Sequence, residues 1–235
     1  MPAFQNELLE LLPREDRHRL LVSCQPVELV PDEVLCEPGA PMQHAFFPTT
    51  GLIALLSLSD GVARIGVGMT GREGMLGASL ALGTTAAQLR AVVQGAGSAW
   101  RIEAQAFRRE LAASPALQQL MHRYLYVLMG QLARSAACCR SHEIHPRLAR
   151  WLSMSRDRTG HDNFQVTHDF LGQALGVRRV GVTEAAGALR QMSLISYVRG
   201  DVTVLDRSGL ASAACPCYVA DRQEFRRFTR RALRA

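Results

Sequence analysis

The sequence predicts an α+β protein, with a rolled β-sheet in its first half and mainly helices in its second half. Three observations predict this class. Short apolar or alternating runs separated by turn residues fill positions 27–102, a long leucine-rich helical pattern covers 115–141, and two short helices followed by a hairpin are predicted over 167–205.

The predicted strands lie between Val27 and Ile102 and follow a helical N-terminal segment, in which Phe4, Leu8, Leu11 and Leu12 share one face. Several short strands at regular spacing favour a β-barrel, β-sandwich or β-roll, and Asp60-Gly61 is a strong pair for a hairpin turn. The turns that separate these strands are predicted at Pro38-Gly39, Thr50-Gly51, Asp60-Gly61 and Thr70-Gly71.

A long helix is predicted to follow a short one over 103–114. Ser114 is placed to cap it and Pro115 suits its first position, so the helix should run to about Ser141. One apolar stripe could pack against the β-roll and against a second copy of the helix; the alternative is burial on the β-roll alone. The residues expected at a dimer interface are Leu117, Met121, Leu125, Leu128 and Leu132.

Beyond this helix, Pro146 predicts a hinge beside Ile144-His145. The following pattern predicts a helix over 147–156, a polar loop over 157–164, a helix over 207–213 capped by Asp206 and a basic final helix over 218–235 with a frayed tip. We therefore expect three parts: 1–114 as a β-roll with flanking helices, 115–145 as the long helix and hinge, and 146–235 as the last domain.

The segment 167–198 carries the most specific pattern in the chain. Thr167 should cap a helix over 168–175, and Gly176 should end it. A second helix is expected over 178–192, buried through small and apolar positions at a spacing of three or four residues. This is the pattern of a helix-turn-helix, whose second helix enters the DNA major groove.

The residues predicted to contact DNA lie on the exposed side of this motif. Arginine pairs well with guanine and glutamate can accept from cytosine, while a hairpin over 195–205 resembles a wing whose tip could reach phosphate. The alternative is a helical hairpin that serves only packing, with solvated arginines. The candidate DNA-binding residues are Thr167, Arg178, Arg179, Thr183, Glu184 and Arg199.

The positive charge of the chain is concentrated in its second part. The net charge of the chain is +6. Residues 140–235 hold 16 arginines and 9 acidic residues, whereas residues 1–139 hold 11 arginines and 12 acidic residues. A basic domain joined to a near-neutral one suits phosphate binding. The sequence has neither a secretory signal pattern nor a membrane-spanning apolar run, so we expect a cytoplasmic protein with no membrane partner.

The order of these parts resembles the Crp/Fnr family of bacterial transcription regulators. The most specific portion is HPRLARWLSMSRDRTGHDNFQVTHDFLGQALGVRRVGVTEAAGALRQMSLISYVRGDVTVLDRSGL. The resemblance implies a cyclic-nucleotide-binding-like β-roll and a winged helix-turn-helix, and a function without enzymatic activity. It also implies a homodimer that binds pseudo-palindromic double-stranded DNA, a small-molecule effector and, for an activator, RNA polymerase as a further partner.

The same resemblance assigns roles to individual residues. Thr167 and Arg178 fall at positions where the family contacts phosphate, and Arg179 falls at an arginine that reads guanine. The next reading positions are a glutamate and an arginine in the family, but Val180 and Glu184 here. The family's operator sequence is therefore not transferred to this chain.

The effector side departs further from the family pattern. Where cyclic-nucleotide-binding members have a ribose-binding glutamate this chain has Met75, and Thr85-Ala86 replaces an arginine–serine pair that holds phosphate. We therefore do not expect cyclic AMP, and the effector and any cofactor are left unassigned. Cys24 and Cys36 alone do not make an Fnr-type iron–sulfur cluster. The candidate effector pocket comprises Met75, Leu76, Gly77, Thr85 and Arg90.

The cysteines and histidines near the hinge leave two interpretations open. The simpler one is that they fill a helix seam and a polar hinge, without a metal, and that Cys215-Pro216-Cys217 is an ordinary loop. The alternative is a thiol- or metal-dependent sensor or metalloprotein, since residues three or four apart share a helix face. A ligand-independent architectural DNA binder is a further alternative. The sensor would use Cys138, Cys139, His142 and His145.

Overall fold

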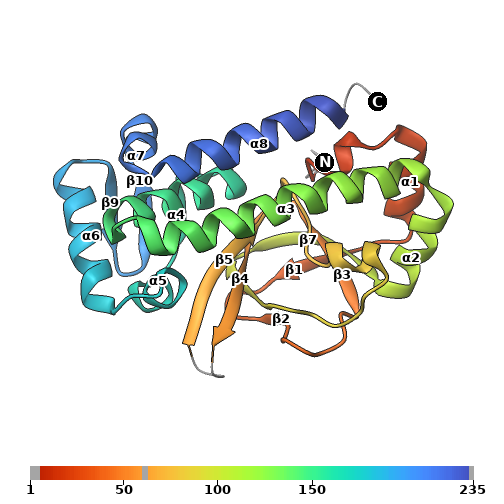
Figure 1. Cartoon of the computed structure of the whole chain (residues 1–235), viewed down its shortest axis with the longest axis horizontal. Coiled ribbons are helices and arrows are strands. Elements are labelled where there is room, and N and C mark those ends of the chain that lie inside the picture. The colour runs from red at the N-terminus through yellow and green to blue at the C-terminus, as the bar shows by residue number, and fades with distance from the viewer. Residues whose placement is uncertain (1–5, 60–62, 233–235) are drawn as a thin grey trace.

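The computed structural model describes residues 6–59 and 63–232 and has the predicted α+β architecture (Figure 1). A 3-10 turn at Leu9–Leu11 and helix α1 (Arg14–Val22) precede a β-roll of two antiparallel sheets, ordered β1-β7-β3 and β2-β6-β4-β5. The strands are β1 (Gln25–Leu29), β2 (Val34–Cys36), β3 (His44–Pro48), β4 (Leu52–Ser59), β5 (Ala63–Thr70), β6 (Arg90–Gly95) and β7 (Gly97–Glu103). Phe4 and the Asp60-Gly61 turn pair lie outside the described residues.

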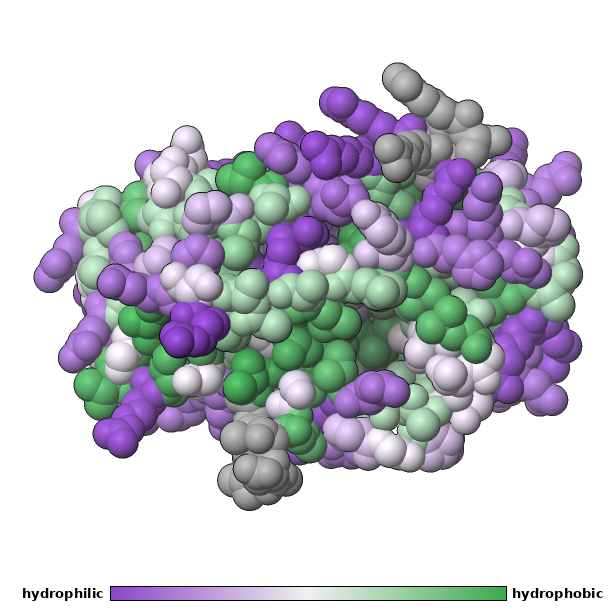
Figure 2. Space-filling model, in the orientation of Figure 1, coloured by the Kyte–Doolittle hydropathy of each residue, from purple (hydrophilic) through white to green (hydrophobic). Residues whose placement is uncertain are grey.

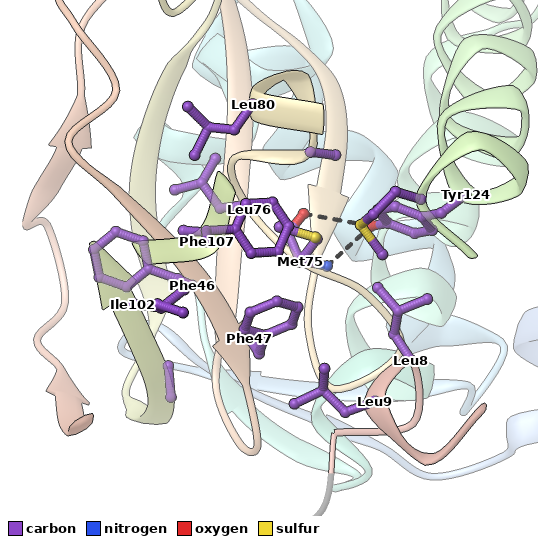
Figure 3. Close-up of a cluster of buried hydrophobic side chains, with 14 of the residues drawn as sticks. Leu8, Leu9, Phe46, Phe47, Met75, Leu76, Leu80, Ile102, Phe107 and Tyr124 are labelled. Atoms are coloured by element: carbon purple, nitrogen blue, oxygen red, sulfur yellow. Dashed lines mark hydrogen bonds between the residues drawn. The ribbon is translucent and has the colours of Figure 1, made fainter. Parts of the chain in front are cut away.

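The core of the β-roll is closed by the helices that flank it. Phe47 and Phe107 are fully buried with their rings edge to face, and the hydroxyl of Tyr124 is hydrogen-bonded to the backbone of Met75 (Figure 3). Phe107 belongs to α2 (Ala104–Ala113) and Tyr124 to α3 (Pro115–Ser141), so both helices seal the same core. A short 3-10 helix, η2 (Ala78–Leu82), lies beside α3.

Helix α3 begins as its sequence predicts. The Ser114 hydroxyl accepts a hydrogen bond from the Leu117 backbone N–H at 3.0 Å, and Pro115 occupies the first helical position, where its missing N–H costs no hydrogen bond. The helix then runs along the β-roll and on toward the second half of the chain, and helix α8 lies beside it (Figure 1).

The second half is a winged helix-turn-helix domain. Helix α4 begins before Pro146, which sits in its first turn, so the break between α3 and α4 falls at His142–Glu143 rather than at Pro146. The predicted polar loop also contains a strand, β8, stabilised by antiparallel pairing with β10. The elements are α4 (Ile144–Thr159), β8 (Asn163–Gln165), α5 (His168–Leu175), α6 (Arg179–Gln191), β9 (Ile195–Val198), β10 (Asp201–Val204), α7 (Arg207–Ala213) and α8 (Pro216–Ala232).

The two halves pack against each other through α4, α5 and α8. Helix α5 lies on β5, and Trp151 of α4 packs against Gly66, where even a methyl group would lie 2.7 Å from the indole ring. Helix α8 returns to the β-roll, so that Phe228 joins the first core beside Tyr124. No helix in the described ranges is long and apolar enough to cross a membrane.

Candidate nucleic-acid interface

The corner between α5 and α6 is set by local backbone chemistry. The Thr167 hydroxyl accepts from the Phe170 N–H at 3.1 Å, and Gly176 ends α5 with a left-handed φ of 64°. The Val177 N–H donates to the Gly172 carbonyl at 2.9 Å, and a Cβ at Gly172 would lie 3.1 Å from the Val177 carbonyl oxygen. Small size at position 172 is therefore what lets the corner close.

The buried side of this corner fixes the orientation of α6. Leu171 and Leu175 of α5 are buried with four residues of α6, at the spacing expected for a single helix face. The α6 residues are Val182, Ala185, Ala186 and Leu189. Because these side chains face inward, the opposite face of α6 is turned to solvent.

The exposed face of α6 carries the predicted reading residues. Arg178 is the N-cap of the helix rather than its first residue, and Arg178, Arg179, Thr183 and Glu184 are all exposed. Val180 is 66% exposed and adds an apolar side chain to this charged face. Arg179 lies 3.5 Å from Asp169 in an ion pair whose side chains are both about two-thirds exposed, so solvent screens it strongly.

Two half-buried residues that the sequence pattern did not single out lie beside this face: His168 of α5 and Tyr197 of β9. The Thr183 hydroxyl donates to the Arg179 carbonyl at 3.1 Å and lies 3.0 Å from Nδ1 of His168, so Nδ1–H is the donor in that second contact. The His168 ring lies 4.3 Å from the ring of Tyr197, centre to centre. Burial lowers the pKa of His168, and the positive charge of Arg179 lowers it further.

The wing has the geometry of a tight two-residue hairpin. Strands β9 and β10 pair from Ile195↔Val204 to Val198↔Asp201, and both loop residues have positive φ, 50° at Arg199 and 92° at Gly200. Arg199 is exposed at the tip. With Thr167 it borders a crevice of about 170 Å³, whose opposite wall includes Asp32 and Gln94 of the β-roll.

The candidate effector pocket is only partly as predicted. Met75, Leu76 and Gly77 line a cavity of about 190 Å³ between the β-roll and α3, in the hollow and hydrophobic area visible in Figure 2. Thr85 and Arg90 are not among its lining residues. Thr85 is exposed, and Arg90 lies 3.4 Å from Glu37 in an ion pair.

This cavity differs chemically from a phosphate site. Its lining contains neither arginine nor lysine. Met75, at the position of the family's glutamate, is 3% exposed, and its backbone N–H donates to the Tyr124 hydroxyl at 3.0 Å. Nothing in the cavity wall would compensate the charge of a cyclic phosphate.

The predicted dimer residues fall on two different faces of α3. Leu117 and Met121 are buried in the core of their own β-roll and cannot contact a second copy, so their assignment to a dimer interface was wrong. Leu125 and Leu128 are partly buried against that core, and Leu132 is exposed. The apolar stripe predicted from the sequence is present on α3, but most of its side chains are buried against the β-roll of the same chain.

The cysteine–histidine cluster near the hinge is also rearranged. Cys138 and His142 come together with Cys215 and Cys217 of the α7–α8 junction. Cys139 is exposed and contacts Arg147 instead, and His145 is not part of the group. Pro216 and Cys217 begin α8 rather than forming the loop predicted from the sequence, and this start of α8 is the partner that the sequence did not reveal.

A β-roll with a cavity against a long helix, joined to a winged helix-turn-helix with arginines on its exposed helix, defines a class of DNA-binding regulators. Domain comparisons divide the chain in the same way. A model of the cyclic nucleotide-binding domain matches residues 26–114, and a model of the Crp-like helix-turn-helix domain matches residues 146–213. The chain belongs to the Crp/Fnr family of transcription regulators.

Several solved structures share the fold. TTHB099, a CRP-family transcriptional regulator from Thermus thermophilus, has a TM-score of 0.65 and 20% identity, over 81% of this chain and 99% of that one. The c-di-GMP-responsive global regulator CLP of Xanthomonas campestris has a TM-score of 0.64 and 14% identity, over 83% of this chain and 100% of that one. FixK2 from Bradyrhizobium japonicum has a TM-score of 0.63 and 14% identity, over 82% of this chain and 98% of that one. No curated protein matches the chain.

Proposed function

We propose that this regulator binds pseudo-palindromic duplex DNA as a homodimer and places the N-terminal part of α6 in the major groove. The observation that carries the proposal is the exposure of Arg178, Arg179, Thr183 and Glu184 on one face of a helix whose other face is buried. Thr167 and Arg199 flank this face and suit phosphate contacts. The domain assignment supports DNA binding; the operator and the dimer are proposals.

The reading face suggests a base preference of its own. Arg179 can donate to O6 and N7 of guanine, and Glu184, one turn along, can accept from the amino group of cytosine. Val180 is exposed directly after the two arginines, where an apolar side chain suits the methyl group of thymine. We expect the half-site to differ from those of relatives that carry a charged residue at position 180.

The dimer would form through the outer face of α3. Tyr126 and Met129 are each 68% exposed there, and Leu132 is also exposed. These side chains follow a spacing of three or four residues along the helix, and small alanines at positions 133 and 136 continue it. A second copy of α3 would remove this apolar stripe from water and would place two α6 helices on one duplex.

The signal would be an apolar small molecule in the cavity beside Met75, with the hinge at His142–Glu143 carrying the response. The lining is mostly aliphatic and methionine side chains, and the cavity reaches the outer face of α3 at Met129 and Leu132. A ligand there would touch both the β-roll and the proposed dimer helix. We expect the protein to act in the cytoplasm and, as an activator, to contact RNA polymerase.

Selection of bound duplexes from a random pool tests the reading assignment. The parent should select an inverted repeat, with a binding constant that falls steeply with salt because phosphate contacts release counterions. Arg179→Ala should lose about 1–3 kcal/mol on the selected site and lose discrimination at one base position. Arg190→Ala, an exposed arginine in the last turn of α6, is the matched control and should keep the selected sequence.

Two results would contradict the proposal. One is an Arg179→Ala variant that binds every sequence as the parent does. The other is a parent protein that selects no sequence at all, which would instead support architectural DNA binding. Adding the small-molecule fraction of a cell extract then tests for an effector, since a sensor changes its DNA affinity.

A further inference from the structure

Four metal-binding side chains from two segments far apart in the chain meet at the hinge between α3 and α4. Their ligand atoms all lie within 4.8 Å of one another. The Sγ atoms of Cys138 and Cys215 are 3.5 Å apart, and the Sγ of Cys217 lies 3.8 Å from Nδ1 of His142. The group is therefore three thiols and one imidazole around a common centre: Cys138, His142, Cys215 and Cys217.

This geometry fits one tetrahedral metal ion. Zn–S bonds of about 2.3 Å and Zn–N bonds of about 2.0–2.1 Å place the ligand atoms of a tetrahedron roughly 3.4–3.8 Å apart. Two of the six distances between the ligand atoms fall at this spacing, and all six are within 4.8 Å. Thiolate and imidazole ligands select zinc over magnesium or calcium, which require oxygen ligands. Four protein ligands leave no open position, as in structural rather than catalytic zinc sites.

The local backbone holds the four ligands in place. Cys138 lies in the last turn of α3 and His142 is its C-cap, one helical turn apart. Cys215 and Cys217 flank Pro216, the first residue of α8, so both sulfurs lie at the positive end of that helix dipole. The Cys215 N–H donates to the Pro146 carbonyl at 3.1 Å, which ties this junction to the first turn of α4.

The charges around the cluster favour an anionic metal complex. Asp221 of α8 is buried and pairs with two arginines, Arg134 at 2.5 Å and Arg150 at 2.7 Å, so this triad carries one positive charge in excess. Arg150 is itself buried and lies within electrostatic reach of the three cysteines. A zinc ion with three thiolates and a neutral imidazole carries one negative charge and would balance the triad.

We infer that these four side chains bind one zinc ion, which clamps the end of α3 to the start of α8 across the hinge. The two ligand segments, Cys138–His142 and Cys215–Cys217, lie before and after the helix-turn-helix in the sequence, so the ion fixes how the DNA-binding domain leaves the long helix. Loss of the ion releases the start of α8 from the end of α3, while Phe228 still joins the far part of α8 to the core of the β-roll.

Metal content and cobalt substitution test this inference. The full chain, purified under reducing conditions and dialysed against a weak chelator, should retain about one zinc per chain. Cobalt replacing the zinc should give the visible d–d bands of a tetrahedral site and the near-ultraviolet charge transfer of thiolate ligands. Removal of the metal by a strong chelator should lower the melting temperature, and added zinc should restore it.

Matched variants separate this site from incidental thiol binding. Cys215→Ser and Cys217→Ser should each weaken zinc retention at least tenfold, whereas Cys139→Ser, next to Cys138 but exposed and outside the group, should keep the parent's zinc and cobalt spectrum. A fully reduced parent that retains no zinc and gives no tetrahedral cobalt bands would overturn the inference, as would zinc lost equally from Cys139→Ser.

One further experiment, a DNA-binding measurement, rests on the proposed function. If α6 reads DNA, removal of zinc should change affinity for the selected duplex, because the hinge is released. The metal and melting measurements do not depend on DNA. A protein that binds zinc but no DNA would refute the proposed function and leave the zinc site standing. A protein that binds the selected DNA but no zinc would refute the zinc site and leave the proposed function standing.

Discussion

Arg158 of α4 and Glu73 of the β-roll form an ion pair across the interface between the two halves, with Nε and Oε1 2.9 Å apart. Arg158 Nε also donates to the Met69 carbonyl at 3.1 Å, so one buried guanidinium bonds to two points of the β-roll. Both side chains are largely buried, so removing one partner leaves an uncompensated charge in the interface. The pair is therefore one of the contacts that hold the two domains in their relative position, beside the packing of α5 on β5 and of Trp151 against Gly66.

We expect Arg158→Met to lower the free energy of unfolding by about 3 kcal/mol, because Glu73 is then left buried without its partner. Urea unfolding measures this loss. The double variant Glu73→Gln/Arg158→Met should lose less than the two single variants together, since neither charge then remains. Additive losses would show that the two residues stabilise the protein independently.

Glycine at position 66 is required by the packing of α4 on β5. A Cβ there would lie 2.7 Å from the Trp151 ring and 2.9 Å from the Ala174 carbonyl oxygen, whereas a Cβ at Gly68, two residues along the same strand, meets nothing closer than 3.5 Å. Gly66→Ala should therefore destabilise the protein by about 1–3 kcal/mol through overpacking. Gly68→Ala should be close to the parent. Thermal unfolding of both variants decides the point, and equal melting temperatures would contradict it.

The helix-turn-helix was predictable from the sequence because its rules are local. A capping threonine, a glycine at the end of α5 and a spacing of three or four buried residues each act within a few positions of the chain, and Thr167, Gly176 and Leu189 occupy the predicted places. Strand β8 was not predictable in this way. Three residues with polar neighbours form a strand there only because β10 supplies the hydrogen bonds.

The misassigned residues share a different cause. Periodicity shows that Leu117 and Met121 lie on an apolar stripe but not which surface covers them, and the β-roll covers them here. The cysteine cluster depends on α8 packing beside α3, which brings residues 138–142 to residues 215–217. Spacing within one segment could reveal only half of that group, and the alternative sensor that it suggested included Cys139 and His145, which lie outside the group.

The outer face of α3 gives a direct test of the proposed dimer. Met129→Glu would place a charge in the centre of the apolar stripe, where a second helix cannot solvate it, so we expect a dimer in the parent and a monomer in the variant. Met192→Glu makes the same change at an exposed methionine at the end of α6 and should leave the dimer intact. Sedimentation equilibrium measures the mass of each. A Met129→Glu protein that dimerises as tightly as the parent would rule out this face.

His168 provides a pH-dependent test of the α5–α6 corner. Burial is the main cause that lowers its pKa below the usual 6.5, and the charge of Arg179 is the second. In the window between the folded-state pKa and about 6.5, the unfolded chain binds the proton more tightly than the folded one. Stability should therefore fall as pH drops through this window, and the loss should be complete below the folded-state pKa.

Nuclear magnetic resonance titration of the His168 ring measures this directly. We expect a midpoint below 6.5 in the parent and a midpoint closer to 6.5 in Arg179→Ala, because one of the two causes is removed while the burial is kept. Arg190→Ala, at the other end of α6, should leave the midpoint where it is in the parent. A midpoint at or above 6.5 in the parent would show that the ring is solvated or paired with an anion, rather than desolvated beside the positive charge of Arg179.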